Sequence, residues 1–139
     1  MGCALAASRL ADKSGLEPKT PTVLVVEDEV LIRFAIADEL RSSGLSVVEA
    51  ANADEALTVL RSSAPVDLLF TDIRMPGSID GLALAALVRT THPELKIIIA
   101  SGHLSVSPSR DIADAFFSKP YDTVSVVSQI KELLVSIEK

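Results

Sequence analysis

Two apolar segments of the sequence are followed directly by acidic residues. The run Val66–Thr71 is rich in β-forming residues, and the carboxylate of Asp72 comes immediately after it. The β-branched run that begins at Thr22 leads in the same way to an acid pair, Glu27 and Asp28. A single acid at a strand end is common in turns and needs no chemical role. The repetition raises the question of whether these acids act together.

Two other polar side chains close later apolar segments. Ser101 ends the segment Leu95–Ser101, and Lys119 ends the short segment Ala115–Lys119. In an open parallel sheet, ligands bind just beyond the carboxyl ends of the strands. We therefore expect the three acids to gather in one crevice, with the serine hydroxyl and the lysine ammonium approaching from the other side.

Three carboxylates in one crevice repel one another, and without a cation one of them would be driven towards protonation. A hard divalent cation removes this repulsion, and all-oxygen ligation with room for water suits Mg²⁺. The alternative is a solvated rim of surface charges in which Lys119 only pairs with an acid. We favour the metal site because an acid pair, an acid, a hydroxyl and a lysine occupy four separate strand ends.

Strands and helices alternate along the sequence. Short apolar runs between turn residues indicate five strands: Thr22–Glu27, Ser46–Ala50, Val66–Thr71, Leu95–Ser101 and Ala115–Lys119. Their continuously apolar character predicts a parallel sheet that is covered on both faces. The expected fold class is α/β, a doubly wound five-stranded parallel sheet with strand order 2-1-3-4-5 and flavodoxin-like topology.

The first helix is expected within the segment 29–44, where Gly44 provides the stop. Four residues are predicted to form its apolar face: Leu31, Phe34, Ala37 and Leu40. The simplest position for three phenylalanines is the core: Phe34, Phe70 and Phe117.

The remaining helices have clear starts but one weak member. Asn52 can cap the second helix, with Glu55 three residues on for the reciprocal bond. Serines around Pro108 weaken the fourth helix, which is expected only from about that proline. The others are predicted at about 52–63, at 80–91 and from Asp122 or Thr123 onwards.

Composition and charge limit the classes of function. The chain has 139 residues, of which 48% are hydrophobic and 23% charged, which is typical of one globular domain. The formal net charge of −6 disfavours nonspecific binding to nucleic acid and to anionic membranes. No apolar run approaches the ~20 residues that span a bilayer.

The N-terminal segment differs in composition from the rest. We interpret Met1–Pro21 as a flexible leader and expect the domain over Thr22–Lys139. The one cysteine, Cys3, rules out an intrachain disulfide and fits a reducing compartment, so a cytoplasmic location is expected.

Four segments together resemble the receiver domain of two-component response regulators: VLVVEDE, DLLFTDIRMPG, IIIASGH and FFSKPY. Each is modest alone, but their order and intervals are highly specific, and the match covers about Thr22–Lys139. The resemblance implies a phosphorylation switch with Asp72 as the phosphoacceptor. It also implies a Mg²⁺ site made by Glu27, Asp28, Asp72 and the backbone carbonyl of Arg74.

The resemblance also implies roles for residues on the other side of Asp72. Ser101 matches the switch hydroxyl and Lys119 the lysine that contacts the phosphate. Phe116 matches the switch aromatic, and Pro120 matches the residue that follows a cis peptide bond. The implied partners are a histidine kinase or phosphotransfer protein and an unknown downstream protein, without nucleic acid or membrane. The expected protein is a monomer or weak homodimer that catalyses only its own phosphorylation and dephosphorylation.

Some features differ from the commonest pattern of this family. The turn MPGSIDG is one residue longer, the acid pair is Glu-Asp, the switch aromatic has no hydroxyl, and the fourth helix is weak. With DIRMPGSIDGL and KPYD, these features resemble the stand-alone receivers common in alphaproteobacteria. We therefore expect no output domain in the chain.

Other functions remain open. A phosphorelay intermediate or a phosphate sink would use the same residues. An aspartyl-phosphate phosphatase is disfavoured, because such enzymes carry a second acid two residues past the nucleophile, where this chain has Arg74. Intact acids and Lys119 disfavour a degenerate scaffold, and the lack of a glycine-rich loop after the first strand disfavours dinucleotide binding. His103 could tune dephosphorylation, although a solvent-facing histidine is the simpler reading.

Overall fold

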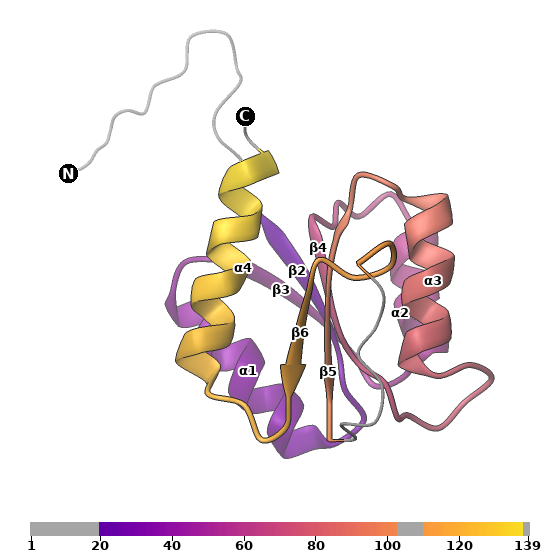
Figure 1. Ribbon diagram of the computed structural model, residues 1–139, viewed down its shortest axis with the longest axis horizontal. Helices are drawn as coiled ribbons and strands as arrows, with labels where there is room; N and C mark the ends of the chain where they lie inside the picture. The colour runs from indigo at the N-terminus through magenta and orange to yellow at the C-terminus, as the bar shows by residue number, and fades with distance from the viewer. Residues whose placement is uncertain (1–19, 103–109, 138–139) are drawn as a thin grey trace, which may run out of the picture.

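The computed structural model describes residues 20–102 and 110–137, and these residues form a five-stranded parallel sheet with helices on both faces (Figure 1). Most of the predicted leader and His103 lie outside the described residues. The order across the sheet is β3-β2-β4-β5-β6, so the predicted order 2-1-3-4-5 is confirmed. The strands are β2 (Thr22–Val26), β3 (Ser46–Ala50), β4 (Leu68–Asp72), β5 (Lys96–Ser101) and β6 (Ala115–Ser118).

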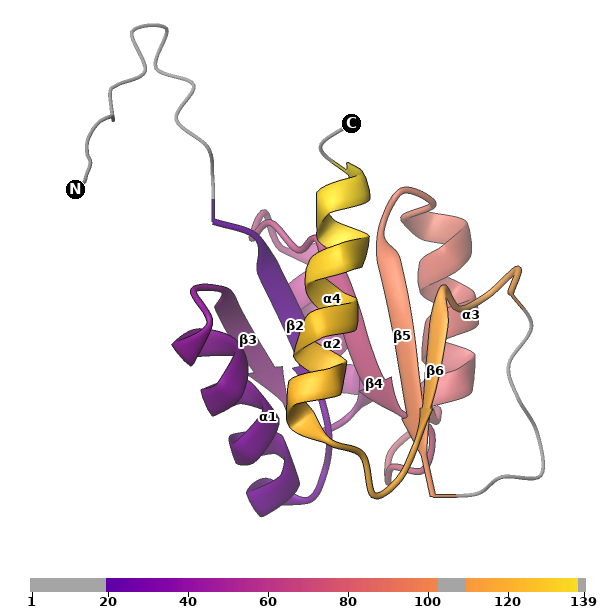
Figure 2. The same ribbon diagram turned by 60° about the vertical axis from the view of Figure 1, so that its left-hand side comes forward.

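Two pairs of helices enclose the sheet. Helices α1 and α4 lie on one face, and α2 and α3 lie on the other (Figures 1 and 2). The four helices are α1 (Val30–Ser42), α2 (Ala53–Arg61), α3 (Gly81–Thr91) and α4 (Thr123–Ile137). No helix in the described ranges is both long and apolar enough to cross a membrane.

Successive residues of the central strands belong to opposite layers of the core. In β2, Val23 and Val25 pack under α1 and α4, whereas Leu24 and Val26 pack under α2 and α3. All four side chains are fully buried. Because neighbouring strand residues point to opposite faces, a sheet covered on both faces requires such uninterrupted apolar runs.

Local sequence signals set several helix ends as predicted. The Asn52 side chain accepts a hydrogen bond from the Glu55 backbone N–H at 2.8 Å. The Glu55 carboxylate reaches one residue further back than expected and accepts from the Ala51 N–H at 2.7 Å. Gly44 follows α1 with a φ of 96°, a conformation that costs glycine little. The second helix ends at Arg61, two residues before the predicted Ser63.

The predicted apolar face of α1 is wrong. Leu31 is 84% exposed and Phe34 is 63% exposed, whereas Ile36, Ala37 and Leu40 are buried. Steps of three residues drift around a helix with about 3.6 residues per turn, so residues nine apart point in opposite directions. Leu31 and Leu40 therefore cannot share a face. Figure 2 also shows that the first turns of α1 extend past the end of β3, where no strand lies beneath them.

Two other predictions need adjustment. The third predicted strand began at Val66, but β4 runs from Leu68 to Asp72, so the acid is the last residue of the strand itself. The segment Arg110–Asp114 contains no helix, and the rest of the predicted fourth helix, 103–109, lies outside the described residues. Of the phenylalanines expected in the core, Phe70 is buried in the core layer under α1 and α4, and Phe117 is partly buried against that layer.

Candidate functional site

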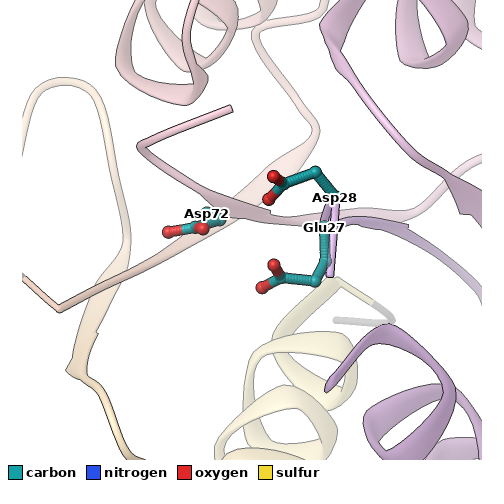
Figure 3. Close-up of side chains that lie close together, drawn as sticks. All are labelled: Glu27, Asp28 and Asp72. Atoms are coloured by element: carbon teal, nitrogen blue, oxygen red, sulfur yellow. The ribbon is translucent and has the colours of Figure 1, made fainter. Parts of the chain in front are cut away.

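The three acids lie together at the carboxyl edge of the sheet. Glu27 and Asp28 follow β2, and Asp72 ends the neighbouring strand β4. One carboxylate oxygen from each residue lies within 4.8 Å of the others. Figure 3 shows the side chains of Glu27 and Asp28 extending from one strand end towards Asp72. The predicted gathering of the three carboxylates is therefore observed.

Asp72 is held on both its side chain and its backbone. It is only 7% exposed, and its Oδ1 accepts a hydrogen bond from the Ile73 N–H at 2.8 Å. The Thr71 hydroxyl donates to the Asp72 carbonyl at 2.9 Å. A methyl group on Gly81, the first residue of α3, would overlap that same carbonyl. Glycine is therefore required there for α3 to pack directly against the strand end.

The ammonium of Lys119 joins two of the acids. Its Nζ donates to Glu27 Oε1 at 2.8 Å and to Asp72 Oδ2 at 3.0 Å. Burial would lower the pKa of Lys119, but its hydrogen bonds and attraction to the two carboxylates outweigh burial and raise it. The lysine therefore stays charged at neutral pH. It lies beside a cis peptide bond to Pro120, as the resemblance implied.

Glu27 is the most enclosed of the three acids at 2% exposed. Burial raises its pKa above the ordinary value, and hydrogen bonds from Lys119 and from the Glu29 N–H act in the opposite direction. When ionised, three carboxylates against one ammonium leave two negative charges, which matches one divalent cation. The donors are all oxygen, and Asp28 lies nearer to solvent, where water could complete the ligation. These residues fit a Mg²⁺ ion.

The residues predicted on the other side of Asp72 lie on β5 and β6. Ser101 is the last residue of β5 and is 1% exposed. Phe116 pairs with Ile99 in the sheet and is partly buried against the core layer under α2 and α3. These positions fit the expected switch pair, whose roles stay predictions.

Arg74 lies on the loop after β4, beside the acids. It is exposed, and its loop lines an open hollow of about 430 Å³ together with Asp28. The other lining residues are Met75, Pro76 and Asp80. A metal contact through the Arg74 carbonyl stays a prediction.

Sequence reasoning missed the part played by Arg33. The sequence pattern indicates only a polar position of the first helix for this residue. Its guanidinium instead donates to the Glu27 carbonyl at 2.8 Å and to Glu49 of β3 at 3.1 Å. An arginine shortly after the acid pair, with an acid in the neighbouring strand, was the available signal.

An apolar groove of about 430 Å³ lies next to Lys119, between the start of α1 and the loop before α4. Tyr121 forms part of its wall and contacts Phe70 edge-to-face at 5.6 Å between ring centroids. Burial raises the pKa of Tyr121 to about 12, so its hydroxyl stays protonated. The other lining residues are Leu31, Ile32, Ala35, Pro120 and Thr123.

Comparison with known proteins agrees with this fold. The response regulator receiver domain family matches residues 23–131. The chain is 37% identical over 118 residues to the sensor kinase CckA of Brucella abortus, which covers 81% of this chain and 12% of that protein. The chain therefore spans only a small part of that relative.

Two solved structures extend the comparison. A CheY-like receiver domain protein from Methanospirillum hungatei has a TM-score of 0.80 at 27% identity, covering 86% of this chain and 98% of that one. The response regulator TrrA from Thermotoga maritima, in complex with Mg²⁺-BeF, has a TM-score of 0.74 at 32% identity, covering 82% of this chain and 99% of that one. With the family match over most of its length, the chain belongs to the response regulator receiver domain family.

Proposed function

We propose that Asp72 accepts a phosphoryl group from a histidine kinase or phosphotransfer protein, and that the protein signals through its phosphorylated form. The observation that carries this proposal is the position of Lys119, whose ammonium bridges Glu27 and Asp72 at 2.8 and 3.0 Å. That geometry puts a fixed positive charge beside a nucleophilic carboxylate. The TrrA structure, solved with Mg²⁺-BeF, supports the same use of the fold.

The proposed reaction is a phosphoryl transfer between side chains. A carboxylate oxygen of Asp72 forms the new P–O bond while the P–N bond to the donor histidine breaks. Lys119 would neutralise charge on the phosphoryl oxygens in the transition state. The predicted metal ligands are Glu27, Asp28, Asp72 and the Arg74 carbonyl, and a bound Mg²⁺ would supply further charge neutralisation.

The proposed signal arises on the other side of Asp72. A phosphoryl group adds about −1.5 to −2 of charge. The Ser101 hydroxyl would bond one of its oxygens, and Phe116 would turn inwards behind the serine. Phosphorylation would thereby shift the population between two packings, by an amount limited to their difference in affinity for the phosphate. A downstream protein that prefers one packing would read the state.

The donor protein must reach the carboxyl edge of the sheet. The apolar groove beside Lys119, with the exposed Leu31 in its wall, lies at that edge, so it is available to an apolar surface of the donor. A relay step or phosphate sink would use the same chemistry and differ only in the next acceptor.

The test is intact mass measured after treatment with a small phosphodonor and Mg²⁺. The unmodified protein should gain one phosphoryl group, and Asp72→Asn should gain none. Asp80→Asn is the matched control: Asp80 lies in the neighbouring hollow and caps α3, and asparagine caps equally well. An equal adduct on Asp72→Asn would refute the proposal.

A further inference from the structure

The carboxylate of Asp28 depends on its backbone for its position. Within residues 20–102 and 110–137, no hydrogen bond or ion pair to the Asp28 side chain is found, in contrast to Glu27 and Asp72. A carboxylate left free in this way can turn all its oxygen lone pairs to a metal. Its placement then depends on the peptide unit that joins it to Glu27.

Besides the ion pair with Lys119, three hydrogen bonds fix Glu27, and one of them acts on that peptide unit. The Glu27 N–H donates to the Ala50 carbonyl at 3.0 Å, as a continuation of the β2–β3 pairing. The Glu27 carboxylate accepts from the Glu29 N–H at 3.1 Å. The Glu27 carbonyl accepts from Arg33 Nη1 at 2.8 Å. Because a peptide unit is planar, holding this carbonyl also fixes where the chain enters Asp28.

The guanidinium of Arg33 is itself fixed. Its Nε donates to Glu49 Oε1 at 3.1 Å, and its side chain is only 18% exposed. Glu49 comes from β3, the edge strand, so the contact ties α1 to the sheet. The other oxygen of Glu49 accepts from Arg41 Nη1 at 3.0 Å. Arg41 is 47% exposed, and its second contact is with the Val47 carbonyl rather than with Glu27.

We infer that Arg33 is a positioning residue for the metal site, because its guanidinium, braced by Glu49, sets the peptide plane that delivers the Asp28 carboxylate. This inference rests on the proposed Mg²⁺ site. If Arg33 acted only through its charge, its removal would raise the Mg²⁺ affinity, because a nearby positive charge repels the metal ion. Weaker binding after its removal therefore reports positioning and not charge.

The experiment is calorimetric titration of the metal-free protein with Mg²⁺ alone. Arg33→Met should lower Mg²⁺ affinity by about tenfold, the lower end of the range for residues that orient metal ligands. Arg33→Lys keeps one donor for the Glu27 carbonyl and should recover part of the loss. The matched control is Arg41→Met, which removes a cation from the same Glu49 without touching Glu27, and its Mg²⁺ affinity should stay within about twofold of the unmodified protein.

Three other results would contradict the positioning role or the metal site. Unchanged or tighter Mg²⁺ binding by Arg33→Met overturns the positioning role and leaves the proposed function intact. An equal loss in Arg41→Met shows a general effect of α1–β3 packing and also overturns it. No Mg²⁺ binding by the unmodified protein overturns the metal site and this inference together. If circular dichroism shows Arg33→Met unfolded, Glu49→Ala decides, because it removes the brace of the Arg33 guanidinium: Mg²⁺ affinity equal to that of the unmodified protein overturns the role.

Discussion

The two sides of Asp72 are held to the sheet in different ways. The acid side consists of Glu27 and Asp28, and Glu27 is bonded there through its N–H, its carbonyl and its carboxylate. The hydroxyl side consists of Ser101 and Phe116. The described residues that lead into Phe116 are anchored at the opposite edge of the sheet, where Asp114 contacts Ile97 and Arg89.

We interpret this difference as a division of tasks. A metal site benefits from ligands that are positioned before the ion arrives. A switch instead needs an element with two accessible packings that a ligand can bias. The acid side has the dense contacts of the first kind, whereas the contacts of Ile112 with Arg89 and of Asp114 with Ile97 lie towards the other end of the strands from Asp72. Lys119 connects the sides, because it directly follows β6 and binds both Glu27 and Asp72.

Removing that connection should have the largest effect. Lys119→Met leaves two buried carboxylates, whose side chains are 3% and 9% exposed, without their cation. Uncompensated buried charge of this kind costs about 3–5 kcal/mol, so we expect the free energy of unfolding in metal-free buffer to fall by about 3 kcal/mol. Mg²⁺ should recover part of the loss, because it would neutralise the same acids. Urea unfolding with and without Mg²⁺ measures both effects.

The control for Lys119→Met is Lys131→Met, an exposed position on α4. Its effect should stay within about 0.5 kcal/mol. A Lys119→Met variant as stable as the unmodified protein would show that the acids need no fixed cation.

The second prediction separates metal binding from stability on the acid side. Asp28→Ala should weaken Mg²⁺ binding by about 100-fold or more, because a direct ligand matters at least as much as the residues that orient it. The metal-free variant should nevertheless be more stable by roughly 1 kcal/mol, because one repelling charge is gone. Calorimetry and chemical unfolding measure the two effects. A destabilised variant with unchanged Mg²⁺ affinity would make Asp28 a structural residue.

The third prediction concerns the hydroxyl side. Ser101→Ala should still be phosphorylated on Asp72, but it should bind a beryllofluoride–Mg²⁺ phosphate analogue about tenfold more weakly, the size of one hydrogen bond to a charged group. It should also lose any preference of a downstream partner for the modified form. Ser118→Ala, at the paired but exposed position of β6, is the control. Equal analogue affinity in both variants would remove Ser101 from the switch.

The smallest expected effect is local. Backbone amides of residues 110–112 should exchange with solvent faster than those of β2, since few of their groups are buried. The phosphate analogue with Mg²⁺ should slow this exchange. The Asp114 amide, bonded to the Ile97 carbonyl at 2.8 Å, serves as an internal reference. Slow exchange throughout 110–112 in the free protein would contradict the contrast between the two sides.

Much of the fold could be predicted because its signals are local. Runs of apolar residues marked all five strands, and the order of the sheet followed from general rules of parallel connection. The end of each strand then placed Glu27, Asp28 and Asp72 at one edge. Prediction failed for α1, where Leu31 and Phe34 are exposed, because similar apolar residues occur on more than one side of that helix. Only the position of the helix over the sheet decides which side is buried.

The sequence alone therefore determined which residue types reach the carboxyl edge, because strand ends and side-chain types are local properties. Only the tertiary structure decided which atoms meet there. Lys119 binds Glu27 from 92 positions away in the sequence. Arg33 donates to the backbone carbonyl of Glu27, a contact that no pattern of side chains in the sequence predicts. Hydrogen bonds depend on differences of tenths of an ångström and on angle, and those follow from how separate elements pack against one another.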